Sequence, residues 1–226
     1  MQTPDYAGVP GVAECRLDAA TLARLPANET PAPWTGEFTA VVWWARAGRA
    51  ATRAAAAGGP SGPRALIVAG GFAAYDHTPV GRYHEVFGAI GVRHGAGVAG
   101  TVPFMAVDSL ASLVAGRGNW SLPKCPATFT GDPGQGLLTA RGDEWTVRAE
   151  PRPFGPWFPL PVAGRLVQRW PDGVHRMAVL RGRARARAAI VEVQVESAGQ
   201  LATWLRPGRH LGAVLSQASF TLSESR

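Results

Sequence analysis

Short apolar stretches separated by turn residues dominate the pattern of hydrophobic and polar positions along the chain. Stretches rich in β-branched and aromatic residues predict strands. They lie at 36–44, 65–74, from Tyr83 onward, at 98–107, 127–130, 137–140 and 144–149, and the segment 151–161 that follows is rich in proline. The pattern predicts a mainly β (α+β) fold, a largely antiparallel curled sheet or barrel with a few short flanking helices.

Helical spacing is confined to three short segments. The first runs over 18–25, where Asp18 can cap the first turn, and the second over 50–57. The third is predicted over 108–115, with Asp108 as the N-cap and Gly116 at the C-terminal end. The segment 116–126 that follows (GRGNWSLPKCP) contains several helix breakers, and it is expected to be neither a long helix nor a central strand.

Length and composition indicate one globular domain. The chain has 226 residues, of which 46% are hydrophobic and 17% charged, which excludes disordered and collagen-like classes. We expect a single domain over 1–226, with residues 1–35 as an N-terminal extension packed on it. The sequence has no long apolar run, no signal-like leader and only two cysteines, and these features predict a cytoplasmic protein without a membrane partner.

Lys124 is the only lysine among 23 basic residues. Unlike guanidinium, a lysine amine can lose its proton and attack a carbonyl group, so a lysine retained in an arginine-rich chain is a candidate nucleophile. The alternative is chance survival at a surface position. Prolines 123 and 126 stiffen the backbone around it.

Other chemistry-bearing patterns are weak. Arginines 181, 183, 185 and 187 alternate along a predicted strand and are interpreted as a solvated face, so no specific nucleic-acid partner is expected. The histidines and cysteines lack metal-ligand spacing, and we expect neither a metal nor a cofactor. Eight tryptophans, several of them beside loops, suggest an apolar cavity for a small apolar substrate.

The segments GRYHEVFGAIGV and VPFMAVDSLASLVAGRGNWSLPKCP resemble the acetoacetate decarboxylase family. They share a Tyr-x-Glu strand, an Asp-led helix that ends in Gly-Arg, and a Pro-Lys pair shortly after it. The resemblance implies a β-cone or barrel with an internal apolar pocket, assembly into homo-oligomers, and a lysine that forms a Schiff base with a ketone.

By position, the resemblance implies that Lys124 and Glu85, 39 positions apart, are the catalytic residues. The substrate-binding candidates are Tyr83, Trp43, Trp44, Phe104, Trp120 and Arg117, with a bridge near the helix end as the alternative role of Arg117.

Three features of the family are missing. Its decarboxylases have a second lysine where this chain has Cys125. By ungapped alignment a second carboxylate falls on Gly70, and the substrate-gripping arginine falls near Trp43 and Trp44, with Arg46 as a shifted candidate. We expect Trp and Gly at these places to enlarge and dry the pocket, which disfavours acetoacetate as the substrate.

Three functions remain open. The first is an enzyme of secondary metabolism that acts on a bulky ketone or polyketide-like substrate, with a Lys124 Schiff base and decarboxylation, aldol or dehydration chemistry. The second is a cofactor-free cyclase of polyketide or antibiotic biosynthesis that preorganises its substrate in the same pocket without a Schiff base. The third is a non-catalytic relative that binds a small ligand.

Overall fold

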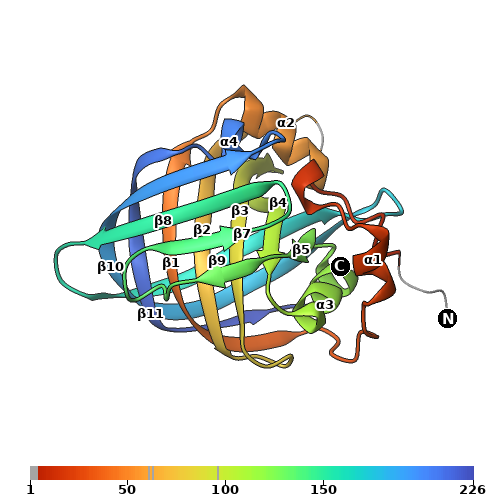
Figure 1. The fold of residues 1–226 in the computed structure, drawn as a ribbon, viewed down its shortest axis with the longest axis horizontal. Helices are drawn as coiled ribbons and strands as arrows, with labels where there is room; N and C mark the ends of the chain where they lie inside the picture. Colours follow the sequence, from red (N-terminus) through yellow and green to blue (C-terminus); the bar gives the residue numbers. More distant parts are fainter. Residues whose placement is uncertain (1–4, 61, 63, 96) are drawn as a thin grey trace.

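The computed structural model describes residues 5–60, 62, 64–95 and 97–226. The helical elements are few and short (Figure 1): η1 (Ala13–Cys15), α1 (Ala19–Ala23), α2 (Arg49–Gly58), α3 (Leu110–Trp120) and α4 (Leu201–Trp204). The strands are β1 (Trp34–Arg46), β2 (Ala65–His77), β3 (Tyr83–His94), β4 (Gly97–Val107), β5 (Lys124–Pro126), β6 (Thr128–Thr130), β7 (Leu138–Arg141), β8 (Trp145–Pro153), β9 (Phe158–Arg169), β10 (His175–Ser197) and β11 (Gly208–Leu222). The predicted mainly β fold is therefore confirmed.

One large curled sheet contains all of these strands. Its order is β11-β1-β2-β3-β4-β9-β10-β8-β7-β6, and β5 pairs with β4. The long strand β10 also pairs with β11, so the sheet curls back on itself at the left of Figure 1. The sheet is mixed, because β4 runs parallel to β5 and to β9, and its pairing with β9 rests on Gly100 and Leu166 alone. We therefore describe a curled sheet, not a closed barrel.

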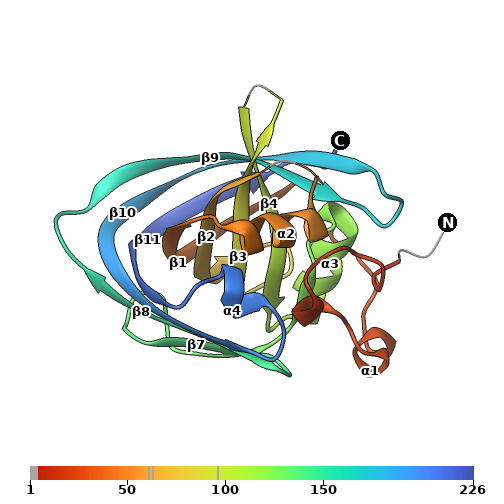
Figure 2. The ribbon, with the colours of Figure 1, turned by 90° about the horizontal axis from the view of Figure 1, so that it is seen from above.

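The central strands bury both of their faces. Val41 and Phe72 belong to a large apolar cluster that also includes side chains of α2, α4, β7 and β8. Their neighbours Ala40 and Ala73 belong to a second cluster, which is rich in alanine and includes side chains of β9, β10 and β11. Successive residues of a strand point to opposite faces, so these two clusters lie on the two sides of β1 and β2. Figure 1 shows α2 and α4 at one end of the curled sheet, at the top of the picture, and Figure 2 shows the same end from above.

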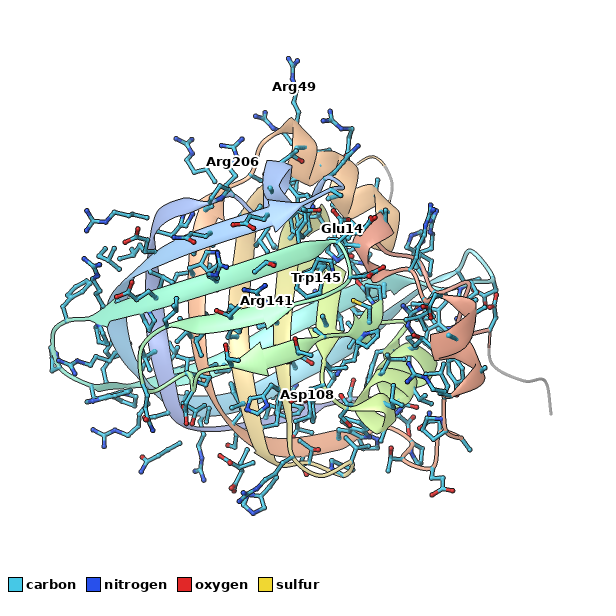
Figure 3. All side chains as sticks on the ribbon, in the orientation of Figure 1. Glu14, Arg49, Asp108, Arg141, Trp145 and Arg206 are labelled. Atoms are coloured by element: carbon cyan, nitrogen blue, oxygen red, sulfur yellow. The ribbon has the colours of Figure 1, made fainter. Side chains whose placement is uncertain are left out.

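The third helix begins and ends later than the sequence predicts. Its N-cap is Ser109, whose Oγ accepts from the Ser112 backbone N–H, and it continues through GRGNW to Ser121 in the left-handed region at φ 52°. Asp108 instead contacts His84. Its Oδ1 accepts a hydrogen bond from the His84 backbone N–H, and its Oδ2 lies 2.7 Å from the ring nitrogen Nδ1 of His84. Figure 3 shows Asp108 near the start of this helix.

The N-terminal segment packs on the sheet through backbone and side-chain hydrogen bonds. Val12 N–H donates to the Pro103 carbonyl oxygen. Glu14 Oε1 accepts from Ser197 Oγ and from the Leu201 backbone N–H, both at 2.7 Å, and so connects η1 to the start of α4. No helix in the described ranges is both long and apolar enough to cross a membrane.

Candidate active site

Lys124 and Glu85 form a buried ion pair. Lys124 Nζ lies 2.9 Å from Glu85 Oε2, and the two residues are 3% and 4% exposed. The same amine donates to Ser112 Oγ at 2.9 Å and lies 4.9 Å from the centre of the Tyr83 ring. The structure therefore brings together the two residues that the sequence names as catalytic, although they come from β5 and β3.

Three local features place Lys124 there. The short strand β5 pairs in parallel with the end of β4, with Lys124 opposite Met105. The aliphatic part of the lysine lies against Gly116, where a Cβ atom would be 2.6 Å from Lys124 Cδ. Arg117 Nε donates to the Lys124 carbonyl oxygen. The glycine in α3 therefore has a packing role next to the lysine and does not end the helix.

Two tyrosines enclose the carboxylate. Tyr75 O–H donates to Glu85 Oε1 at 3.2 Å, and its ring stacks on the Tyr83 ring with the centres 4.5 Å apart. Burial, followed by the nearby Glu85 charge, raises the pKa of both phenols well above the usual value of 10.0. Both therefore stay protonated at neutral pH, and Tyr75 remains a hydrogen-bond donor to Glu85.

The aromatic wall continues away from the ion pair. The Tyr75 ring contacts Phe38 and Phe220, with centres 5.5 and 5.8 Å away. Phe220 also borders a hollow of about 460 Å³ on the surface, lined by residues that include Thr35, Glu37 and Arg181. Neither this hollow nor a second one of about 400 Å³ near Arg141 and Glu144 is lined by Lys124, whose amine is enclosed by protein groups.

Arg117 does not have the predicted substrate-binding role. It is 2% exposed, and its Nε, Nη1 and Nη2 donate to the carbonyl oxygens of Lys124, Tyr6 and Cys15, each at 2.6 Å. Burial lowers the pKa of this guanidinium below its usual value. Because backbone carbonyl oxygens occupy its donors, Arg117 connects the N-terminal segment to the strand that carries Lys124. This is the alternative role expected for it, a bridge near the end of the helix.

The pocket is not enlarged at Gly70 and Trp43, contrary to expectation. They are partners in the β1–β2 register, and a Cβ atom on Gly70 would overlap the Trp43 ring. Trp43 therefore fills the space that the glycine leaves. In addition, Gly70 lies on the sheet face of Phe72, whereas Glu85 pairs with Ala73 on the other face. The ungapped alignment therefore placed the second carboxylate on the wrong side of β2, and Tyr75 is the β2 side chain that reaches Glu85.

The other predicted lining residues are dispersed. Trp44 is 38% exposed and points to the face opposite Trp43, so the two cannot line one cavity. Phe104 packs edge-on against Trp145 in the large cluster, with centres 5.0 Å apart. Trp120 packs against Trp34 at 5.2 Å and donates to the Ser223 carbonyl oxygen. Of the predicted lining residues, only Tyr83 contacts the ion pair through its side chain.

Cys125 also faces away from the amine. It is a buried free thiol in the large apolar cluster, next to the free Cys15, and both sulfurs contact the Met105 carbonyl oxygen. The hydrogen bond with Cys15 and burial raise the pKa of Cys125 well above 9.0. Since neighbouring strand residues point to opposite faces, position 125 is not beside the Lys124 amine.

Two further expectations concern groups away from this site. Arginines 181, 183 and 185 are exposed, as expected for a solvated strand face, and Arg187 donates to the Gly155 carbonyl oxygen. Within the part of the chain that the structure describes, no group of three or more His, Cys, Asp or Glu side chains could hold a metal ion.

The sequence missed Ser112 and Tyr75. Ser112 lies one helical turn before Gly116, so the two share a helix face. A sequence prediction that continued the helix past Gly116 would have placed Ser112 on that face. Tyr75 comes within reach of Glu85 only through the pairing of β2 with β3, in which Tyr75 is opposite Tyr83.

Comparison with known proteins finds one matching family model. A family model described as acetoacetate decarboxylase (ADC) matches residues 63–152, which include both members of the ion pair. No curated protein sequence matches the chain.

Solved structures share the fold at low identity. The enduracididine biosynthesis enzyme MppR with HEPES bound is 17% identical, with coverage of 88% of this chain and 89% of that one and a TM-score of 0.61. MppR complexed with the condensation product of pyruvate and imidazole 4-carboxaldehyde is 16% identical, with coverage of 88% and 90% and a TM-score of 0.59. Acetoacetate decarboxylase from Legionella pneumophila is 15% identical, with coverage of 90% of each chain and a TM-score of 0.55.

Proposed function

From the premise that this chain belongs to the acetoacetate decarboxylase superfamily, we propose that it is an enzyme that forms a Schiff base between Lys124 and a bulky ketone. The observation that carries the proposal is the buried contact of 2.9 Å between Lys124 Nζ and Glu85 Oε2. It gives the only lysine of the chain a proton acceptor in a site without bulk water.

The same carboxylate can balance the protons of the reaction. Glu85 takes one proton from the Lys124 ammonium, and the free amine attacks the carbonyl carbon of the ketone to give a carbinolamine. Glu85 then returns the proton to the departing hydroxyl group, which leaves as water while the C=N bond of the iminium forms. The iminium withdraws electrons from the neighbouring carbon–carbon bond, as decarboxylation, aldol or dehydration chemistry requires.

The surroundings favour an apolar ketone over a small keto acid. The rings of Tyr75 and Tyr83 contact the pair, and Phe38 and Phe220 pack on Tyr75. Among the described groups that contact the pair, the one further cation is Arg117, and backbone carbonyls occupy its donors. A substrate carboxylate would therefore lack a cationic partner, and we expect acetoacetate to be a poor substrate.

The MppR complex holds a condensation product of pyruvate on the same fold. By analogy it supports carbonyl condensation as one chemistry that this scaffold can host. A homo-oligomeric cytoplasmic enzyme of secondary metabolism remains our expectation.

A cofactor-free cyclase is the second candidate. It is favoured by the two buried phenols, which stay protonated and could donate hydrogen bonds to a folded polyketide-like substrate. In that case Lys124 or Glu85 acts only as a proton donor or shuttle, and no covalent adduct forms.

Borohydride trapping separates the two candidates. The protein is incubated with 2-octanone, pyruvate or acetoacetate and sodium borohydride, then digested with trypsin. An adduct on Lys124 blocks cleavage there and gives a peptide over 118–141 with added mass, in place of 118–124 and 125–141. We expect the adduct with 2-octanone above the other two, and none in Lys124→Arg, which keeps the charge beside Glu85. Absence of any adduct together with turnover of a polyketide-like substrate would favour the cyclase.

A further inference from the structure

Two hydroxyl groups contact the ion pair from opposite ends. Tyr75 O–H donates to Glu85 Oε1, the carboxylate oxygen that Lys124 does not use. Ser112 Oγ accepts a hydrogen bond from Lys124 Nζ. Each hydroxyl therefore touches one member of the pair.

We propose that Tyr75 and Ser112 are positioning residues that hold the pair in its ionised form, Tyr75 by stabilising the Glu85 carboxylate and Ser112 by stabilising the Lys124 ammonium. A hydrogen bond to the charged form of a buried group favours that form, because little water is present to replace it. The geometry separates the two effects, since each hydroxyl bonds a different member of the pair.

The charged and titratable groups around the pair are few. From β3, the Tyr83 ring lies under the amine, with its centre 4.9 Å from Lys124 Nζ. From the turn before α3, the Asp108 charge acts on Tyr83, but its carboxylate is paired with His84. From α3, Arg117 bonds the Lys124 carbonyl oxygen, and from β5, Cys125 points to the other face. Tyr75 and Ser112 are therefore the hydroxyls best placed to bias the pair.

The consequence for catalysis rests on the proposed function. A pair held in its ionised form keeps the amine protonated until a substrate arrives. A ketone whose apolar groups pack against the Tyr75–Tyr83 stack could displace the contacts that stabilise the charges and release the neutral amine. The site would thus couple formation of its nucleophile to binding of a bulky apolar ketone.

The single lysine makes the protonation of Lys124 directly measurable without substrate. In full-length protein labelled with ¹⁵N,¹³C-lysine, one Nζ–Cε signal reports Lys124 during a pH titration, and labelled glutamate carboxyls report Glu85, assigned with Glu85→Gln. We expect Tyr75→Phe to raise the pH midpoint of the carboxyl transition by about one unit and to leave the later lysine midpoint in place. Ser112→Ala should lower the lysine midpoint by about one unit and leave the carboxyl midpoint in place.

Matched variants test whether packing alone explains the shifts. Phe38→Leu alters the ring that packs on Tyr75 without removing a hydroxyl, and Ser109→Ala alters the first turn of α3 without touching the amine. Both should keep the wild-type midpoints, as should Ser112→Thr, which retains the hydroxyl.

The proposal is overturned if Tyr75→Phe and Ser112→Ala leave both midpoints unchanged, or if the controls shift them equally. If Tyr75→Phe does not fold, the wild-type Tyr75 hydroxyl proton serves instead. It should be protected from exchange and lose that protection in Glu85→Leu, which removes the acceptor; equal protection in both would overturn the role of Tyr75. These readouts need no adduct, so the proposal and the Schiff-base function can fail independently.

Discussion

The side chain of Lys124 lies in a slot that Gly116 leaves open on α3. A Cβ atom at position 116 would be 2.6 Å from Lys124 Cδ and 2.7 Å from Cε. Gly118, in the same helix, faces Asn28 and Tyr6 instead. Alanine substitutions at the two glycines therefore separate two effects. Only the one at Gly116 removes the space for the lysine, whereas both replace a glycine within the helix.

Gly116→Ala should impair the site more than the fold. Alanine in a helix interior gains about 1 kcal/mol over glycine, which offsets part of the cost of moving a flexible lysine. Displacement of the amine from Glu85 by about 1 Å should still reduce borohydride-trapped adduct about 100-fold. Gly118→Ala is the control and should trap adduct like the wild type; equal trapping by both variants would contradict the packing role of Gly116.

Removing one member of the buried pair should destabilise the fold. Lys124→Met leaves the Glu85 carboxylate without a cation and should lower the free energy of unfolding by about 3–5 kcal/mol. Lys124→Met combined with Glu85→Gln removes both charges and should recover a large part of that loss. Urea unfolding of both variants measures the effect, and a double variant as unstable as Lys124→Met would show that lost packing, not an unpaired charge, is responsible.

The raised pKa values of Tyr75 and Tyr83 predict alkaline sensitivity. A tyrosine whose pKa is higher in the folded state contributes stability that is complete below its usual value of 10.0 and is lost as the pH rises through the folded-state value. Cys125, whose pKa is also raised in the folded state, adds a loss of stability of the same sign, which begins near its usual value of 9.0.

The free energy of unfolding should therefore fall steadily from about pH 9 upward. Urea denaturation between about pH 8 and 11 checks this, and the slope should be shallower in a Tyr75→Phe, Tyr83→Phe double variant. An equal slope in that variant would assign the alkaline loss to other groups.

Much of the fold could be predicted from the sequence because local patterns determine it. The β-rich stretches that begin at residues 36, 65, 83 and 98 became β1 to β4, with ends displaced by a few residues. Asp18 caps α1 by accepting from the Thr21 backbone N–H, as predicted. The exception was α3, where the buried Arg117 and Trp120 extend the helix past two glycines that local propensity reads as breakers.

The candidate site was predictable only in part, because register decides which side chains meet. Glu85 and Lys124 could be named from a resemblance, but the face on which Gly70 lies depends on how β2 pairs with β3. An ungapped alignment carries no information about that pairing. For the same reason Tyr75 was missed, although it supplies the β2 contact to Glu85.

The orientation of Cys125 changes what the missing second lysine means for this chain. The sequence suggested that the amine lacks a positive neighbour, yet side chain 125 points into the large apolar cluster near Cys15 and Phe104. Cys125→Lys should therefore bury an unpaired ammonium and lower the free energy of unfolding by at least about 3 kcal/mol. It should not increase the adduct trapped on Lys124, because the new charge lies across the strand from the reacting amine. Cys125→Met, similar in length and uncharged, is the control for steric effects in urea unfolding and adduct trapping. A stable Cys125→Lys protein that traps more adduct than wild type would show that a lysine at 125 can reach the site.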